Sequence, residues 1–289
     1  MSIQAAVLFI SGQSNAHAHA QAMAPEDRIL QPLRNVFALD RKENQSFDIK
    51  DVVWSGFTTE GKNLGETQDH TYTLASFLAK RWQKAIDEGC KLPDLYIVQI
   101  SIGSQGIING MWNPDKEKVL KPGKLGEADI ALYALAQHIY PLVMQNLQSS
   151  GKEPEVIGWH WLGSEQEVWN ETYLREDMKE RYNAFFDGMM KAIGVPCPLY
   201  LYLLDLQSFC RRCQIPIKAV EMINEALALQ STRFEKVTMI ELDQCPYWDP
   251  EDAQKGIYAP DGGHYLAKTQ EWFAARFWEE IREKMWFLS

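Results

Sequence analysis

Short apolar runs alternate with longer amphipathic stretches along the chain, and this alternation restricts the possible folds more than any other sequence feature. Several runs are apolar at nearly every position, as expected for β-strands that are covered on both faces. The predicted strands are residues 5–11, 36–39, 95–101, 156–161, 199–205 and 238–243. In the longer stretches, apolar residues recur three or four apart, which is the spacing of a helix with one buried face. The predicted helices are residues 72–88, 128–147, 173–193 and 266–284.

Alternating strands and helices imply a parallel sheet with helices on both faces. Right-handed crossovers keep the carboxyl ends of the strands at one edge, where ligands bind in a crevice. We therefore predict an α/β protein with a three-layer α/β/α, flavodoxin-like arrangement around a central, mostly parallel sheet. A chain of 289 residues suits one such domain, predicted to span residues 1–289. The irregular segments 40–66 and 113–126 are expected to line the crevice.

The acidic charge balance of the chain disfavours some kinds of binding partner. The chain has 29 Lys and Arg against 39 Asp and Glu, a net charge of -10, which disfavours general binding to nucleic acid or anionic membranes. No Lys or Arg precedes Arg28, and the first apolar run is short, so no secretory signal is recognised. We expect a cytoplasmic protein, with a trimmed secreted form as the alternative. The oligomeric state is left open.

The five cysteines are odd in number and widely scattered, which is not typical of a disulfide framework. Cys210 and Cys213 form a Cys-Arg-Arg-Cys pair, the spacing of half a zinc site or of a redox pair. A zinc site needs a second pair, and Cys245 is the only nearby candidate in the sequence. Reduced thiols on a loop are the favoured interpretation. No metal-binding motif is recognised, so neither a metal nor another cofactor is expected.

The first predicted strand ends in Gly12-Gln13-Ser14-Asn15. A serine at this place faces the crevice, and if a helix begins there its own backbone N–H points at the same spot. This geometry suits a nucleophile whose amide stabilises an oxyanion. Considered alone, the motif is a weak signal, and a serine that only caps a helix is the favoured interpretation.

A second motif, Asp261-Gly262-Gly263-His264, precedes the last predicted helix. An aspartate three residues before a histidine can reach its Nδ1, which leaves Nε2 to take a proton from a serine. The alternative is a helix-capping aspartate beside a surface histidine.

Two further strands end in segments that face the same edge. Residues 101–106, Ser-Ile-Gly-Ser-Gln-Gly, form a turn that can cradle an oxyanion, although a plain turn is the alternative and no P-loop is present. Residues 161–165 read Trp-Leu-Gly-Ser-Glu. Because the ends of parallel strands meet at one edge, we expect all four segments to converge on one crevice.

With these four segments in this order, the chain resembles the SGNH-type (GDSL-like) esterases, specifically the branch of carbohydrate esterase family 6 and the sialate O-acetylesterases. That branch has G-Q-S-N, a Gly-Gly turn followed by Trp, then W-x-Q-G-E and a late D-x-x-H. The matching residues are 12–15, Gly103-Ser104 with Trp112, 161–165, and Asp261 with His264. This chain departs from the pattern at Ser104, Gly163 and Ser164.

The resemblance implies a serine esterase in which Ser14 is the nucleophile, His264 the general base and Asp261 the acid that orients it. In some relatives the glutamate of W-x-Q-G-E is the acid, so Glu165 is the rival. The implied oxyanion donors are the N–H of Ser14 and one at Gly103 or Ser104. The implied substrate-binding set also includes Gln13, Asn15 and Trp112.

The implied substrate is a small-molecule or oligosaccharide acetyl ester, such as acetylated xylan or an acetylated sialic acid. Trp54, Trp112 and Trp169 are candidate sugar-stacking faces, with core packing as the alternative. Two other functions stay open: a non-catalytic carbohydrate-binding protein on an esterase scaffold, and an esterase or thioesterase of other acyl specificity. The altered W-x-Q-G-E block favours the binding protein, whereas the retained Ser, Asp and His favour the enzyme.

Overall fold

A computed structural model describes residues 3–17, 21–40, 52–60, 70–115, 131–249, 251 and 256–285. Within these residues, a seven-stranded sheet has the order β3-β2-β4-β1-β5-β6-β7. The strands are β1 (Ile3–Gly12), β2 (Val36–Leu39), β3 (Trp54–Gly56), β4 (Asp94–Ser101), β5 (Lys152–Leu162), β6 (Leu199–Tyr202) and β7 (Val237–Ile240). All neighbouring strands pair in parallel except β2 and β3, which are antiparallel. The predicted mostly parallel sheet is confirmed.

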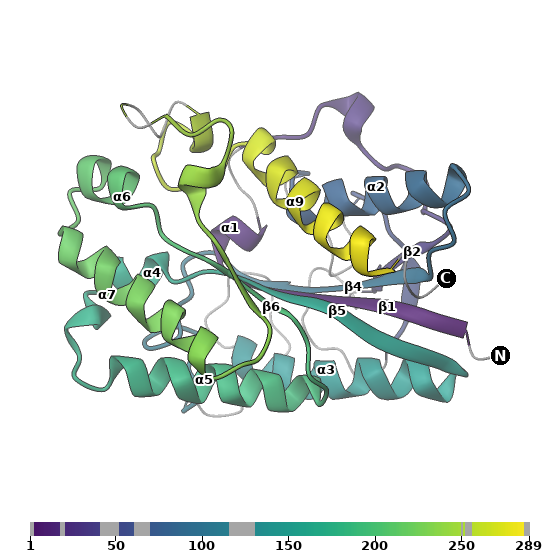
Figure 1. The fold of residues 1–289 in the computed structure, drawn as a ribbon, viewed down its shortest axis with the longest axis horizontal. Helices are drawn as coiled ribbons and strands as arrows, with labels where there is room; N and C mark the ends of the chain where they lie inside the picture. Colours follow the sequence, from purple (N-terminus) through teal and green to yellow (C-terminus); the bar gives the residue numbers. More distant parts are fainter. Residues whose placement is uncertain are drawn as a thin grey trace.

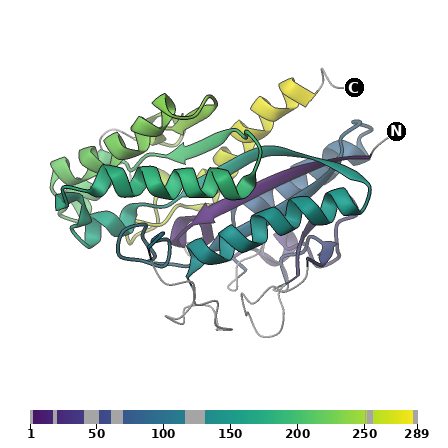
Figure 2. The ribbon, with the colours of Figure 1, turned by 90° about the horizontal axis from the view of Figure 1, so that it is seen from below.

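Helices cover both faces of this sheet (Figures 1 and 2). One face carries α2 (Leu74–Asp87) and α9 (Ala267–Met285). The other carries α3 (Leu132–Ser149), α5 (Met178–Ile193) and α7 (Ile217–Ala228). Shorter helices are α1 (Ser14–His17), α4 (Glu165–Trp169) and α6 (Leu206–Arg212), with 3-10 turns η1 (Pro25–Asp27), η2 (Thr172–Leu174), η3 (Leu229–Thr232) and η4 (Leu242–Gln244). The three-layer α/β/α fold is therefore confirmed.

Strand β1 shows why the sequence specifies this arrangement. Its alternate residues Val7 and Phe9 enter the core beneath α3, α5 and α7, whereas Leu8 and Ile10 enter the core beneath α2 and α9. Successive side chains of a strand point to opposite faces, so a strand covered on both sides must be apolar throughout.

One polar contact crosses the layer beneath α3. The hydroxyls of Ser11 and Tyr140 lie 2.5 Å apart, and the indole N–H of Trp159 donates to the same Ser11 oxygen at 3.1 Å. All three side chains are buried, so this cluster ties α3 to the central strands just before the Gly12-Gln13-Ser14-Asn15 segment.

Several predicted elements differ in extent. Strands β6 and β7 end earlier than predicted, and the helix predicted over 173–193 is divided between η2 and α5. Strand β3 lies inside the segment 40–66 that was expected to be irregular. The rest of that segment at 41–51 and 61–66, and residues 116–126 of the second one, fall outside the described residues. Among the helices in the described ranges, none combines the length and apolarity needed to cross a bilayer.

Candidate active site

The register of the sheet brings three of the four predicted segments to one place. Gly12, the last residue of β1, pairs with Ser101 of β4 on one side and with Leu162 of β5 on the other. Helices α1 and α4 begin directly after β1 and β5, at the carboxyl ends of these strands (Figure 1). Three of the motif-bearing segments therefore meet at the edge of the sheet where the crevice was predicted.

Gly12 is required by the close approach of β1 to β5. Its φ is +150°, and a Cβ atom there would lie 2.0 Å from the carbonyl oxygen of Leu162. The next residue, Gln13, donates its backbone N–H to that same carbonyl at 3.0 Å. Only glycine accommodates this contact, after which α1 begins at the half-buried Ser14.

Asn15 connects the Ser14 turn to the His264 turn. Its Nδ2 donates to the carbonyl oxygen of Gly263 at 2.9 Å, and its Oδ1 accepts the backbone N–H of Tyr265 at 3.0 Å. These two bonds hold the backbone on both sides of His264. The segments carrying Ser14 and His264 are thereby brought together from opposite ends of the chain.

Asp261 and His264 make the contact that their spacing predicts. Asp261 Oδ2 lies 2.7 Å from His264 Nδ1, while Oδ1 accepts the backbone N–H groups of Gly263 at 2.9 Å and His264 at 3.0 Å. Burial opposes ionisation of Asp261, but these hydrogen bonds outweigh it and hold its pKa below the ordinary range. A proton on Nδ1, donated to this carboxylate, leaves Nε2 of the same ring as the basic nitrogen.

Glu165 has a different set of partners. Its buried carboxylate accepts the side-chain N–H groups of Gln13 and of Asn15, the latter at 2.6 Å. Burial raises the pKa of Glu165, and the hydrogen bonds from Asn15 and Gln13 oppose that rise. Of the two candidate acids, the one in hydrogen-bond contact with Nδ1 of His264 is Asp261, whereas Glu165 binds the side chains on either side of Ser14.

The turn after β4 carries the candidate second oxyanion donor. Ser104 is exposed and adopts a left-handed conformation with φ +61°. The side chain of Gln105 accepts the N–H of Met111 at 3.2 Å and donates to the carbonyl of Gly103 at 3.3 Å. The turn that contains Gly103 and Ser104 is thus folded back onto residues 110–112.

Three predicted binding residues occupy other positions than expected. Trp112 is fully buried, with its ring against Trp161 and its indole N–H donated to the carbonyl of Gly12 at 2.9 Å, so it cannot stack on a sugar. Gln13 and Asn15 are also buried and bind Glu165. These three side chains therefore support the turns that carry the predicted site residues.

The other two tryptophans differ from each other. Trp54 packs against Tyr96 near the start of β4, away from the carboxyl edge. Trp169, the last residue of α4, is 48% exposed and remains a candidate for contact with a sugar.

The altered W-x-Q-G-E block has a structural explanation at both changed positions. A Cβ atom on Gly163 would lie 2.8 Å from the ring of Trp161, so no side chain fits here while that indole keeps its place. Ser164 has φ +97°, a conformation that suits the glycine found there in the relatives. Its hydroxyl accepts the indole N–H of Trp161 at 3.2 Å.

A buried glutamate next to this block was not predicted from the sequence. Glu167 is buried, and its Oε1 accepts the backbone N–H of Ile108 at 3.0 Å. In the sequence it is one of two glutamates in a short polar stretch, and no motif marks it as buried. Burial raises its pKa to about 7, which its hydrogen bonds to the turn after β4 oppose.

Cys210 and Cys245 do not share a site. Cys210 lies on α6 and not on the predicted loop, and it packs against the core beneath α3, α5 and α7. Cys245 belongs to the core on the opposite face of the sheet. Within the described ranges, no group of three or more His, Cys, Asp or Glu side chains is arranged to hold a metal.

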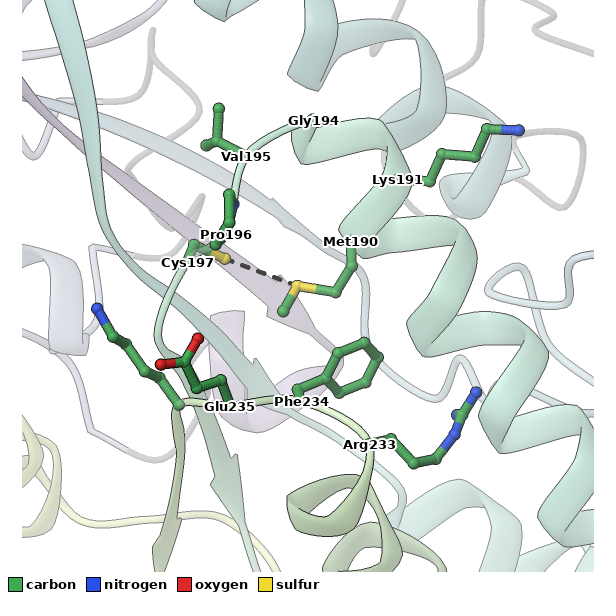
Figure 3. Close-up of a pocket in the computed structure, with 10 residues that line it drawn as sticks. Met190, Lys191, Gly194, Val195, Pro196, Cys197, Arg233, Phe234 and Glu235 are labelled. Atoms are coloured by element: carbon green, nitrogen blue, oxygen red, sulfur yellow. Dashed lines mark hydrogen bonds between the residues drawn. The ribbon is translucent and has the colours of Figure 1, made fainter.

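A surface pocket of about 580 Å³ lies elsewhere (Figure 3). It is bordered by residues 194–197, which precede β6, and 233–236, which precede β7. Met190 and Cys197 form part of its wall, with their sulfur atoms 3.7 Å apart. Because these segments lie before the two strands, the pocket is at the amino edge of the sheet and is not part of the candidate site.

Comparisons with known proteins show a likeness of fold. No protein-family model matches the chain, and no curated protein matches it in sequence. Among solved structures, NanS is similar with a TM-score of 0.59 and 13% identity, over 100% of this chain and 99% of that one. A protein from Arabidopsis thaliana has a TM-score of 0.55 and 10% identity, over 97% and 98% of the two chains. The chain therefore shares its overall fold with these two proteins over nearly its whole length.

Proposed function

We propose that this chain is a serine esterase that removes O-acetyl groups from carbohydrates through an acyl-enzyme. The observation that carries the proposal is the Asp261–His264 pair, fastened beside the Ser14 turn by the side chain of Asn15. A carboxylate on Nδ1 of a histidine, next to a serine at the start of a helix, is the arrangement that activates a hydroxyl as a nucleophile.

In the proposed reaction, Ser14 Oγ attacks the ester carbonyl while His264 Nε2 takes the hydroxyl proton. The backbone N–H of Ser14 and one at Gly103 or Ser104 stabilise the negative oxygen of the tetrahedral intermediate. The intermediate collapses, His264 gives the proton to the departing sugar oxygen, and the acetyl group stays on Ser14 Oγ as an ester. Water then attacks the acyl-enzyme, again with His264 as the base, and acetate is released.

The carbohydrate part of the proposal is supported by the four-motif resemblance and by Trp169. This exposed indole ends the short helix that begins with Glu165, so it lies near the nucleophile turn. Tryptophan offers a flat apolar face of the kind on which a sugar ring packs. The proposed partner is therefore an acetylated oligosaccharide or small sugar ester.

The test uses p-nitrophenyl acetate and a serine-reactive fluorophosphonate. Ser14→Ala should stay folded but lose both hydrolysis and labelling, because the attacking oxygen is gone. Ser231→Ala is the matched control, since this exposed serine on η3 bonds only to its own helical turn in the described contacts. Full activity in Ser14→Ala would refute the mechanism. A screen of acetylated xylo-oligosaccharides, acetylated sialic acids and longer acyl esters then defines the specificity.

A carbohydrate-binding protein without catalysis is the second candidate. It is favoured by the altered block at Gly163 and Ser164, where the serine holds a conformation suited to glycine. The fluorophosphonate separates the two functions. Sugar binding without labelling of Ser14 would support the binding protein, and labelling would support the esterase.

A further inference from the structure

Glu167 is a buried carboxylate that the proposed reaction does not use. Its side chain is 1% exposed, and Oε1 accepts the backbone N–H of Ile108 at 3.0 Å. The N–H of Ile107 also stabilises its charged form. Its Oε2 is buried without a hydrogen-bond partner in the described residues. Burying a carboxylate destabilises the folded protein unless hydrogen bonds offset the loss of water. For Glu167 this offset comes mainly from the backbone N–H groups of the turn after β4.

The turn is shaped to receive this carboxylate. A Cβ atom on Gly106 would lie 2.2 Å from Glu167 Oε1, so the carboxylate rests directly on a glycine backbone. A Cβ on Gly110 would lie 2.1 Å from the backbone nitrogen of Gly106, so the turn is also closed on itself. The backbone N–H of Trp112 donates to the carbonyl of Gly106 at 3.2 Å. A shift at residues 106–108 is therefore transmitted along a tightly folded segment.

That segment continues directly from Gly103 and Ser104. In the same short helix, Glu165 holds the side chains of Gln13 and Asn15, on either side of Ser14. The two glutamates of α4 thus grip the two turns from which the proposed oxyanion donors come. The spacing of Glu165 and Glu167 along α4 therefore sets the distance between the Ser14 turn and the turn after β4.

We propose that Glu167 is a positioning residue, which sets the second oxyanion donor relative to Ser14 by holding the backbone at Ile107 and Ile108. This inference rests on the proposed esterase function. An oxyanion donor stabilises the transition state only when it lies within hydrogen-bond distance of the oxygen that becomes negative. A small displacement of the donor therefore lowers the rate of the chemical step and has less effect on substrate binding.

The experiment compares Glu167→Ala, Glu167→Asp and Glu167→Gln with the wild type. Removing the acceptor in Glu167→Ala should lower kcat for p-nitrophenyl acetate by about 10–100-fold while KM changes little, since loss of one whole donor typically costs ~10²–10³. Glu167→Asp withdraws the carboxylate by one methylene and should give a smaller loss. Glu167→Gln keeps an acceptor oxygen and should retain kcat within about fivefold of the wild type.

A second readout separates positioning from general loss of stability. Phenylboronic acid forms a tetrahedral adduct on an active serine, so its affinity should fall with kcat in Glu167→Ala and Glu167→Asp. The control is Ile223→Ala, which opens a cavity in the core beneath α7 and should lower thermal stability without this change.

The outcomes distinguish the two proposals. Unchanged kcat in both Glu167→Ala and Glu167→Asp, or an equal kcat loss in Ile223→Ala, would overturn the positioning role and leave the esterase intact. A Glu167→Ala chain that does not fold leaves the decision to Glu167→Asp. A wild-type protein that neither hydrolyses esters nor reacts with fluorophosphonate would instead overturn the proposed function and the positioning role with it.

Discussion

Replacing the buried Glu167 by glutamine should change how stability depends on pH. Burial raises the pKa of this carboxyl from 4.5 to about 7. Between these values the unfolded chain releases the proton while the folded protein keeps it, so the unfolded state gains stability as pH rises. The wild type should therefore lose stability from pH 4.5 to 7, and a glutamine at this position should remove that loss.

The size of the effect follows from the two pKa values. One pKa unit corresponds to about 1.4 kcal/mol, so the group should lower the free energy of unfolding by roughly 2–3 kcal/mol between pH 5 and pH 8. Glu165 on α4 and Tyr182 on α5 also interact electrostatically with this carboxyl. Both are present in the wild type and the variant, so the difference between the two proteins isolates Glu167 to first order.

Urea denaturation of both proteins at pH 5, 6, 7 and 8 measures this difference. The free energy of unfolding of Glu167→Gln minus that of the wild type should rise steadily by that amount, whatever its starting value. Glu176→Gln, which removes an exposed carboxylate nearby, is the control and should show no such trend. A difference that stays constant from pH 5 to 8 would show that the Glu167 carboxyl is not destabilised by burial.

Four further substitutions address the site and its support. Asp261→Asn should lower kcat/KM by about 10³-fold or more with little change in Tm, whereas Glu165→Gln should chiefly lower Tm. If kinetics and thermal melts instead showed the rate loss in Glu165→Gln and the Tm loss in Asp261→Asn, Glu165 would be the acid. Asn15→Ala removes the two side-chain hydrogen bonds that clamp the backbone on either side of His264. It should lower the free energy of unfolding, measured by urea denaturation, by about 2–4 kcal/mol and abolish most of kcat. Tyr140→Phe should cost about 1 kcal/mol through Ser11 without affecting kcat, and an unchanged urea midpoint would contradict that.

The fold was predictable where one physical pattern dominates a whole element. Strand β1 is apolar on both faces because both are covered, and its pattern alone indicates a central strand. Strand β3 has only three residues, too few for a period, and it was missed. Helix α7 was also missed, although Val220, Ile223 and Leu227 lie on its buried face with helical spacing.

The contacts of the candidate site were also predictable only where they are local in the sequence. The contact of Asp261 with His264 is local and follows from a three-residue spacing. The partners of Glu165 and the burial of Trp112 depend on which distant segments meet, and residue type does not reveal this. A tryptophan serves a sugar site or a core equally well, so only the neighbouring rings decide.

The clamp made by Asn15 has a consequence for the timing of synthesis. The amide at position 15 holds a backbone that is translated about 250 residues later. Because a chain emerges from the ribosome amino end first, the serine turn exists long before the segment that would supply its base. On the proposed mechanism, the nascent chain would carry an unactivated hydroxyl, and hydrolysis would begin only when the segment before α9 docks and brings the imidazole of His264.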